Sequence, residues 1–300
     1  MSSTPQLVIG CGPVGQSVIR LLSERGIPSV GASRHRPDGF LGNWIKLDAS
    51  DAEAVSSAAS SADVVYLCAA PGLTRWGSDF EPMVKSVLAG LRRGSTLVFA
   101  GNLFPYGDQD GVISESTQEL AQGPQGRLRS RLDRMVLSAE GLSTAIVRSS
   151  SFYGPGVVTS RAGAMEIKAM MDGKPVPALG SPDQPHSMTY IDDFGRALIN
   201  VAHDAASHGR VWIAPVQPPI SQRDLLKAIG ASYGVEPKFR VASKFIVNVG
   251  GLFSPTMRAL KETFYIHAKP YLVDASRYVE YFHDEATALE VSVKETLAQL

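Results

Sequence analysis

The segment Gly10-Cys11-Gly12-Pro13-Val14-Gly15 constrains the fold of this chain more than any other part of the sequence. An apolar run over 6–10 precedes it and predicts a strand. A helical pattern with one apolar face follows over 14–25 and ends at Gly26. A glycine-rich turn between a strand and a helix is typical of a dinucleotide-binding Rossmann unit, and a plain strand-to-helix turn is the alternative interpretation.

Each glycine of this turn has its own expected role. Gly10 permits the tight turn, Gly12 lets a diphosphate approach the backbone, and Gly15 allows the helix to pack closely on the strand. The start of the helix, at Pro13 and Val14, is expected to present free N–H groups and the positive end of the helix dipole to phosphate. The sequence therefore predicts that this turn binds the diphosphate of a dinucleotide.

Short apolar runs alternate with helical patterns along the first half of the chain, which indicates repeated βαβ units and a parallel sheet. The run over 63–69 is apolar along almost its whole length, as expected of a central strand buried on both faces. We therefore predict an α/β fold, a doubly wound parallel sheet of the Rossmann type. Further predicted strands lie at 29–33, 44–47, 96–100 and 144–148, and predicted helices lie at 52–62, 80–91 and 127–138.

Beyond Tyr153 the pattern changes to connections that are rich in glycine and proline. This change predicts a dinucleotide-binding domain over 1–155, to which 188–214 returns, and a smaller substrate lobe built from 156–187 and 215–300. Helices are predicted in this half at 164–171, 191–202 and 222–233, the last with Ser221 as its N-cap.

The turn after the second predicted strand bears on which dinucleotide is bound. Where a NAD site has an acidic residue for the ribose 2′-hydroxyl, this chain has Ser33-Arg34-His35-Arg36. Arg34 offers a charged fork for a 2′-phosphate and Ser33 a second donor, so NADP(H) is predicted in preference to NAD(H), with a solvated basic turn as the alternative. Asp48, just after the third strand, is expected either to meet the adenine edge or to cap the next helix.

The charge balance of the chain argues against large anionic partners. Lys and Arg number 29, as do Asp and Glu, so neither nucleic acid nor a membrane is expected as a partner. The N-terminus lacks the features of a signal peptide, and Cys11 and Cys68 cannot form a disulfide framework, so a cytoplasmic location is expected. His186, Asp192 and Asp193 do not have the spacing of a helical ligand pair, so no metal site is predicted.

Three further segments, 63–70, 148–156 and 188–197, follow the glycine turn in order. Together with that turn they resemble the extended short-chain dehydrogenase/reductases, the NAD-dependent epimerase/dehydratase family, over nearly the whole chain. The resemblance implies that Ala69 and Ala70 lie beside the cofactor and that 148–156 lies beside its nicotinamide.

The resemblance also implies a catalytic Ser, Tyr and Lys, in which Tyr exchanges a proton with the substrate and Lys holds the nicotinamide ribose. Asn102 stands at the expected Ser position, and the Tyr-x-x-x-Lys pattern aligns with Arg127 and Arg131. Arg131 is expected to bind ribose hydroxyls and Asn102 to donate to a carbonyl. Arg127 cannot donate a proton near neutral pH, because the pKa of arginine lies above about 12. Tyr106 and Tyr153 are the nearest candidates for the donor, with a scaffold role as the alternative for each.

These features predict an atypical NADP(H)-dependent oxidoreductase or epimerase/dehydratase-like enzyme that acts on a small, sugar-like substrate between the lobes. The alternative hypothesis is a cofactor-binding sensor without turnover, and the third hypothesis is a protein that has lost cofactor binding. The segments 239–253 and 264–267 are interpreted as core of the second lobe, with a substrate cleft or a dimer face as alternatives, so a homodimer stays open.

Overall fold

A seven-stranded parallel sheet forms the centre of the computed structural model, which describes residues 4–299. The spatial order of the strands is β11-β7-β5-β4-β1-β2-β3, so the chain winds outward from β1 in both directions and the predicted doubly wound sheet is confirmed. The strands are β1 (Gln6–Ile9), β2 (Ser29–Ser33), β3 (Asn43–Lys46), β4 (Val64–Leu67), β5 (Thr96–Asn102), β7 (Ser143–Ser149) and β11 (Val211–Ile213).

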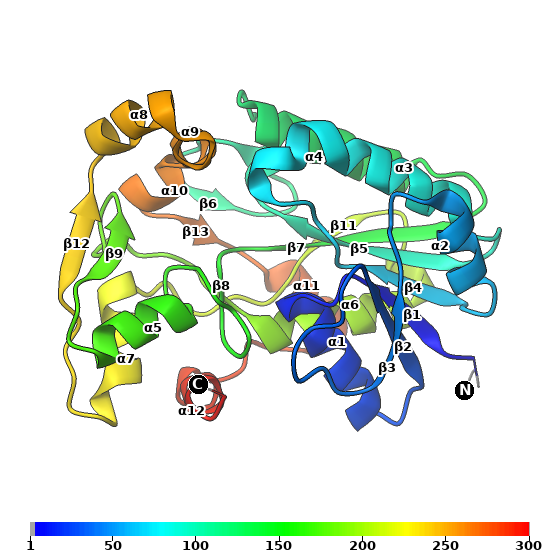
Figure 1. The fold of residues 1–300 in the computed structure, drawn as a ribbon, viewed down its shortest axis with the longest axis horizontal. Coiled ribbons are helices and arrows are strands. Elements are labelled where there is room, and N and C mark those ends of the chain that lie inside the picture. Colours follow the sequence, from blue (N-terminus) through cyan, green and yellow to red (C-terminus); the bar gives the residue numbers. More distant parts are fainter. Residues whose placement is uncertain (1–3, 300) are drawn as a thin grey trace.

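Helices cover both faces of this sheet, as Figure 1 shows. Each layer encloses a separate apolar core, because parallel strands buried on both faces need a cover on each side. The first layer consists of α2 (Ala52–Ala59), α3 (Glu81–Gly90) and α4 (Pro124–Leu137). The second consists of α1 (Pro13–Glu24), α6 (Ile191–His203) and α11 (Ser276–Phe282).

A smaller group of elements lies beside the carboxyl ends of the central strands (Figure 1). Two short parallel pairs within it, β6 with β13 and β8 with β10, link distant parts of the sequence. Its helices are α5 (Ala164–Met171), α7 (Gln222–Ala231), α8 (Lys244–Phe253), α9 (Pro255–Glu262), α10 (Tyr265–Ala268) and α12 (Leu289–Leu297). The short strands are β6 (Val112–Ile113), β8 (Phe152–Tyr153), β9 (Val176–Leu179), β10 (Thr189–Tyr190), β12 (Phe239–Ala242) and β13 (Leu272–Val273).

Of two N-cap residues considered from the sequence, the structure confirms one, Ser221, and does not show the other, Asp48, as a cap. Ser221 is the N-cap of α7, where its hydroxyl oxygen accepts a hydrogen bond from the Asp224 N–H. Asp48 does not cap α2, however, because Asp51 accepts the hydrogen bonds of the first free N–H groups of that helix. The Asp48 carboxylate instead accepts a hydrogen bond from the Ser50 N–H in the preceding turn.

The segment 239–253 belongs only in part to the lobe core that its apolar residues suggested, because Val247 is buried and Phe239 packs against that core, whereas other apolar residues of the segment are exposed. Phe245 and Phe253 are 75% and 84% exposed, so α8 presents apolar side chains to solvent. Phe264 and Ile266, in contrast, are buried as expected. Within residues 4–299, no helix combines the length and the apolar character that a membrane crossing requires.

Buried charged side chains connect α4 to β7 by hydrogen bonds. The Arg148 guanidinium donates from Nε and Nη2 to one carboxylate oxygen of Asp133, at 3.1 and 2.7 Å. It also pairs with Glu119 and lies 4.8 Å above the ring of Tyr106. Arg148 and Asp133 are both buried, so their charges compensate each other inside the protein.

Candidate functional site

The turn between β1 and α1 is built on contacts that exclude side chains at two of its glycines. A Cβ atom at Gly15 would lie 1.8 Å from the carbonyl oxygen of Gly10, and a Cβ at Gly10 would lie 2.4 Å from the backbone nitrogen of Ala69. Gly10 also has a φ of +101°, which L residues rarely adopt. These two glycines therefore allow β1, α1 and the end of β4 to meet closely.

Gly12 differs from its two neighbours because its surroundings are open. Among residues 4–299, and apart from its own chain neighbours, no atom lies within 4 Å of the position that its Cβ would take. Gly12 is the N-cap of α1, and within the same residues no side chain forms a capping hydrogen bond at this helix terminus. A helix start with uncapped N–H groups and free space in front of it fits the diphosphate of a dinucleotide.

Ala69 and Ala70 follow directly on β4 at this turn. The Ala69 backbone lies against Gly10 so closely that no side chain would fit between them. Ala70 is exposed and continues from this position. A contact of either residue with a cofactor stays a prediction.

At the end of β2, Ser33 is occupied by contacts within its own turn. Its hydroxyl donates to the His35 carbonyl at 2.8 Å and accepts from the Trp44 indole N–H at 2.9 Å. The hydroxyl proton is therefore already used, and a second donor role toward a 2′-phosphate would require this hydrogen bond to break.

Arg34, the next residue, is exposed and has no salt bridge among residues 4–299. A hydrogen bond from Ser78 lowers the pKa of Asp79, and the nearby cations Arg75 and Arg34 contribute to the same shift. Arg34 and Arg75 therefore both lie near the carboxylate of Asp79, and the three side chains together carry a net positive charge.

The inner face of α4 differs from the predicted one. Arg127 and Arg131 are both exposed, and Arg131 donates to Glu81 of α3 at 2.6 Å. Gln125 and Arg129, which have the same spacing of four residues, are the buried pair. The reason is that the helix begins at Pro124, three residues earlier than predicted, with proline in the first turn, where it is favoured. Which pair contacts a cofactor stays a prediction.

Arg129 is buried without a carboxylate in direct contact. Its Nη2 donates to the Ala100 carbonyl at 3.0 Å, and its guanidinium lies 4.7 Å from the Phe99 ring centre and 5.1 Å from that of Phe80. Burial lowers the pKa of Arg129 to about 10, against an opposing effect of Asp133. Within the described residues its Nε has no hydrogen-bond acceptor. A buried cation with a spare donor at the carboxyl end of β5 can serve as a ligand-binding group.

The first turn of α4 is held by the smaller lobe. The backbone N–H groups of Gln125 and Gly126 both donate to the carboxylate of Glu262, at 2.9 and 3.1 Å. The Gln125 side-chain amide donates to the Ala259 carbonyl at 3.0 Å. Glu262 thus caps α4 in the way that an acidic residue of the helix itself would.

The other predicted catalytic residues are distributed between the sheet edge and the cores. Asn102 ends β5, half-buried, and its side-chain oxygen accepts from the Phe104 N–H at 3.2 Å. Tyr106 is buried, and the Arg148 guanidinium lies 4.8 Å from the centre of its ring. Tyr153 is also buried, and its hydroxyl shares a hydrogen bond with Ser292 of α12 at 2.7 Å. Burial raises the pKa of both tyrosines, which makes either a weaker acid than a free phenol.

His186 packs as an aromatic residue in the smaller lobe. Its ring lies 5.1 Å from that of Tyr271, and burial lowers its pKa well below the usual value. Across residues 4–299, no three His, Cys, Asp or Glu side chains are grouped so that they could hold a metal ion.

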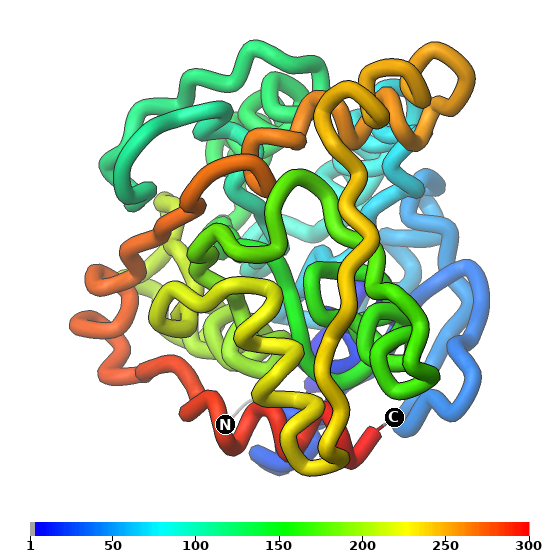
Figure 2. Tube along the Cα trace, turned by 90° about the vertical axis from the view of Figure 1, so that its left-hand side faces the viewer, coloured from blue at the N-terminus to red at the C-terminus, as the bar shows by residue number. Residues whose placement is uncertain are grey.

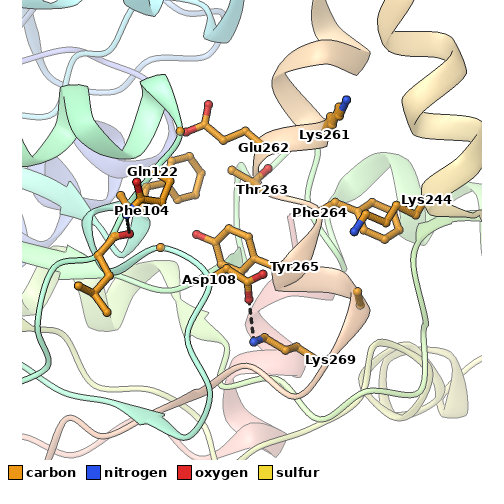
Figure 3. A pocket seen from close by; sticks show the side chains of 15 residues that line it. Phe104, Asp108, Gln122, Lys244, Lys261, Glu262, Thr263, Phe264, Tyr265 and Lys269 are labelled. Carbon is orange, nitrogen blue, oxygen red and sulfur yellow. Dashed lines mark hydrogen bonds and ion pairs between the residues drawn. The ribbon is translucent and has the colours of Figure 1, made fainter.

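A cavity of about 310 Å³ lies between the two parts of the molecule (Figure 3). Its walls come from the loops that follow β5 and precede α4, and from α8 to α10. Lys269 is neutralised by Asp108 and Asp110 at 2.7 Å, whereas Lys244 and Lys261 have no salt bridge within the described part of the chain. The side chains that line the cavity include Phe104, Asp108, Leu120, Gln122, Lys244, Lys261, Glu262, Phe264, Tyr265 and Lys269.

Sequence reasoning missed Gln125, Arg129 and this cavity. The available signal for the first two was Pro124, which marks the first turn of α4 and so sets which residues face inward. The cavity had a weaker signal in the aromatic segment 264–267, which supplies Phe264 and Tyr265 to its wall.

Comparison with known proteins places these features in context. The family described as "NAD dependent epimerase/dehydratase family" matches residues 6–214. An uncharacterized UDP-glucose epimerase of Bacillus subtilis (strain 168) is 28% identical over 161 residues, which are 49% of this chain and 51% of that protein. The match therefore spans about half the length of this curated relative.

Several solved structures have the same fold as this chain. A UDP-glucuronic acid 4-epimerase from Bacillus cereus, in complex with NAD, has a TM-score of 0.73 at 19% identity, covering 98% of this chain and 99% of that one. A dTDP-glucose 4,6-dehydratase from Bacillus anthracis str. Ames, in complex with NAD, has a TM-score of 0.79 at 15% identity, covering 99% and 96%. A UDP-glucose 4-epimerase from Thermotoga maritima, with UDP-glucose, has a TM-score of 0.77 at 18% identity, covering 98% of both chains.

Proposed function

Because the chain belongs to the NAD-dependent epimerase/dehydratase family, we propose that it is a nicotinamide-dinucleotide-dependent enzyme of the epimerase or dehydratase kind, with a sugar-like substrate. The observation that carries this proposal is the turn from Gly10 to Gly15, which combines two closely packed glycines with the open, uncapped helix start at Gly12. This arrangement supports a bound diphosphate.

The proposed cofactor site runs along the carboxyl ends of the central strands. Gly12 and the first turn of α1 would hold the diphosphate, and Ala69 and Ala70 would flank it. When bound, the nicotinamide supplies the capacity to accept and return a hydride. The chain's own part is to hold that ring beside the substrate and to exclude water.

We further propose that the site prefers NADP(H) to NAD(H). The solved relatives named above include NAD complexes, but at 15–19% identity they establish the fold and not the selectivity of this turn. Arg34 is exposed and free of salt bridges at the end of β2, and Arg75 adds a second cation nearby. A guanidinium in this position is suited to a 2′-phosphate, because charge-assisted hydrogen bonds to phosphate are strong.

Arg34→Asp should therefore weaken NADPH binding by roughly 10- to 100-fold, with little loss for NADH. Titration calorimetry with both cofactors measures this selectivity. Arg36→Asp is the matched control, since it introduces the same charge change two residues away. Equal NADPH affinity in the wild type and Arg34→Asp would remove the proposed preference, as would an equal loss in the control.

The proposed substrate site is the cavity described above. One side of it is formed by the connection from β5 to α4, and the other side by the helices α8 to α10. Its lining includes Phe104, which follows Asn102 by two residues, and Gly123, the N-cap of α4. Within the described residues Lys244 and Lys261 form no salt bridge, so they can pair with the phosphates of a nucleotide sugar, such as the UDP-glucose bound to the relative from Thermotoga maritima. Tyr265 lines the same cavity and can stack on a sugar or a base.

The ordinary proton donor of the family is missing on α4, where the inward residue is Gln125. A glutamine side chain can orient an oxygen but does not exchange a proton near neutral pH. Tyr106 and Tyr153 remain proposals as donors. If Tyr106→Phe and Tyr153→Phe both retained full turnover, a tyrosine donor at these positions would be abandoned.

Arg129→Met tests which residue of α4 serves the cofactor. We expect it to weaken cofactor binding about tenfold, because a buried hydrogen-bonding cation is lost. The free energy of unfolding should stay within about 2 kcal/mol of the wild type, since methionine fills the aromatic surroundings and an unpaired buried charge disappears. Cofactor titration together with urea unfolding measures both quantities.

Arg131→Met is the control on the same helix, where the side chain is exposed and paired with Glu81. It should leave cofactor affinity unchanged. Loss of affinity in Arg131→Met alone would instead assign ribose binding to Arg131, as the sequence alignment predicted.

The second candidate function is a cofactor-binding sensor without turnover. It is favoured by one observation, the absence of a Tyr or Lys side chain on α4 within Pro124–Leu137. The two functions separate when NADPH absorbance is followed with a panel of nucleotide sugars. Substrate-dependent change supports the enzyme, whereas binding that raises the melting temperature without any change in absorbance supports the sensor.

A further inference from the structure

The hairpin of α8 and α9 projects from one corner of the molecule. Figures 1 and 2 both show it at the edge, beyond the helices that cover the sheet. Its two helices pack on each other where Gly250 and Gly251 meet Met257 and Arg258. The opposite side of α8 is left without a cover.

This uncovered side is a continuous apolar stripe. Leu252 and Phe253 are 71% and 84% exposed at the end of the helix, and Phe245 is 75% exposed near its start. Ile246 and Val249, also exposed, lie between them. At ~100° per residue the five side chains fall within an arc of about 120°, the width of one helix face. Isolated exposed apolar residues are common, but five on one short helix mark a docking surface.

The charged residues of the segment that carries this stripe all have one sign. Between 237 and 261 the sequence contains no Asp or Glu, although the chain as a whole is neutral. Within residues 4–299 none of the basic residues of this segment forms a salt bridge with an acidic side chain. They are Lys238, Arg240, Lys244, Arg258 and Lys261, and all are exposed.

We propose that the α8–α9 hairpin docks on an anionic lipid surface, with the apolar stripe in the interface and the basic residues toward the headgroups. A helix with large apolar residues on one face, in a segment whose charged residues are all basic, has the composition of an interfacial membrane helix. Lipid headgroups of negative charge complement Lys238, Arg240 and Arg258, each of which contributes near such a surface, whereas Lys244 and Lys261 line the cavity.

A second copy of the chain fits this surface less well. In a symmetric dimer the same segment would come from both copies, so its cations would be brought near one another with no acidic residue of the segment to compensate them. Like charges opposed across an interface cost several kcal/mol. The charge of the segment therefore selects an anionic partner, and the exposed phenylalanines favour a lipid layer into which they can insert.

Vesicle cosedimentation of the full-length protein tests this proposal. The wild type should bind vesicles of phosphatidylcholine with phosphatidylserine, but not vesicles of phosphatidylcholine alone, and should be released at about 0.5 M salt. Lys238→Gln with Arg240→Gln should lower the partition coefficient roughly fivefold for each cation removed. Lys244 and Lys261 are left intact in these variants, because they line the proposed substrate cavity.

Leu252→Ser with Phe253→Ser should lower binding to the same vesicles at least tenfold at low salt. These side chains are exposed, so the variant should fold, and unchanged cofactor affinity checks this. Leu41→Ser is the control, since Leu41 is 86% exposed on a distant loop, and it should bind as the wild type does.

Three outcomes would overturn the proposal. The first is no binding of the wild type to anionic vesicles at low salt. The second is binding that survives Leu252→Ser with Phe253→Ser and is matched by soluble polyglutamate, which would point to an acidic protein. The third is a lipid-free dimer that these substitutions dissociate, which would show that a second copy covers the stripe. None of these outcomes bears on cofactor binding, so the proposal stands or falls separately from the proposed function.

Discussion

Gly12→Asp should abolish dinucleotide binding while the protein stays folded. The backbone of Gly12, with φ −71° and ψ −171°, suits any L residue, and its side-chain position is open. An aspartate there would occupy the N-cap of α1, where Gly→Asp changes stability by only a few tenths of a kcal/mol. Its carboxylate would stand where the diphosphate is held, and like charges in contact cost several kcal/mol. The dissociation constant for NADPH should therefore rise roughly 100-fold or more.

Ser243→Asp is the matched control, because Ser243 is the N-cap of α8, far along the chain from the glycine turn. It adds the same charge at the same kind of helix terminus. Calorimetric titration of both variants should show a loss only in Gly12→Asp. An unchanged NADPH affinity in Gly12→Asp would mean that the diphosphate is not bound at this turn.

Arg148→Met should destabilise the protein by about 3–5 kcal/mol, because it leaves Asp133 buried without its cation. The same change also removes the partner of Glu119 and the cation above the Tyr106 ring. Since Arg148 joins β7 to α4, the loss should loosen the helix that carries Gln125 and Arg129. Urea unfolding measures the effect.

A double variant keeps this prediction testable if Arg148→Met does not fold. Adding Asp133→Leu removes the uncompensated charge, so the double variant should recover much of the lost stability. Arg131→Met is the exposed control, where the pair with Glu81 should contribute no more than about 1 kcal/mol. A loss below about 1 kcal/mol in Arg148→Met would show that the buried charges are not coupled as the structure indicates.

The sheet and the glycine turn could be predicted because their signals are local. The strand β2 over 29–33 and the helix α5 over 164–171 have the predicted bounds, since Pro28 precedes the strand and Gly163 and Gly173 lie on either side of the helix. The roles of Gly10 and Gly15 also follow from the turn itself, and the contacts of these residues agree with them.

Which residues of α4 face the sheet could not be predicted as reliably. A shift of two residues turns a helix by about 200°, so aligning on Arg127 and Arg131 exchanges the inner and outer faces. Placing the helix start at Pro124 would have corrected the phase. The contacts of Tyr153 were beyond local reasoning altogether, because its partner Ser292 lies 139 residues away.

Net charge and apolar periodicity could not predict the exposed apolar face and the local positive charge of the segment around α8. The balance of 29 basic and 29 acidic residues hides a segment in which all charges are positive. The apolar periodicity of 239–253 indicates that a helix has an apolar face, but it does not indicate whether another part of the chain covers that face. Here the tertiary structure leaves it exposed.

The central claim is that the mouth of α1 binds a nicotinamide dinucleotide, and thermal unfolding of the wild type with NADPH and with NAD⁺ tests it most directly. Ligand at about 100 times its dissociation constant stabilises the native state by about 2.7 kcal/mol, which should raise the melting temperature by roughly 4–8 °C. We expect this rise with at least one of the two cofactors, and no rise in Gly12→Asp. An unchanged melting temperature with both cofactors at millimolar concentration would contradict the account.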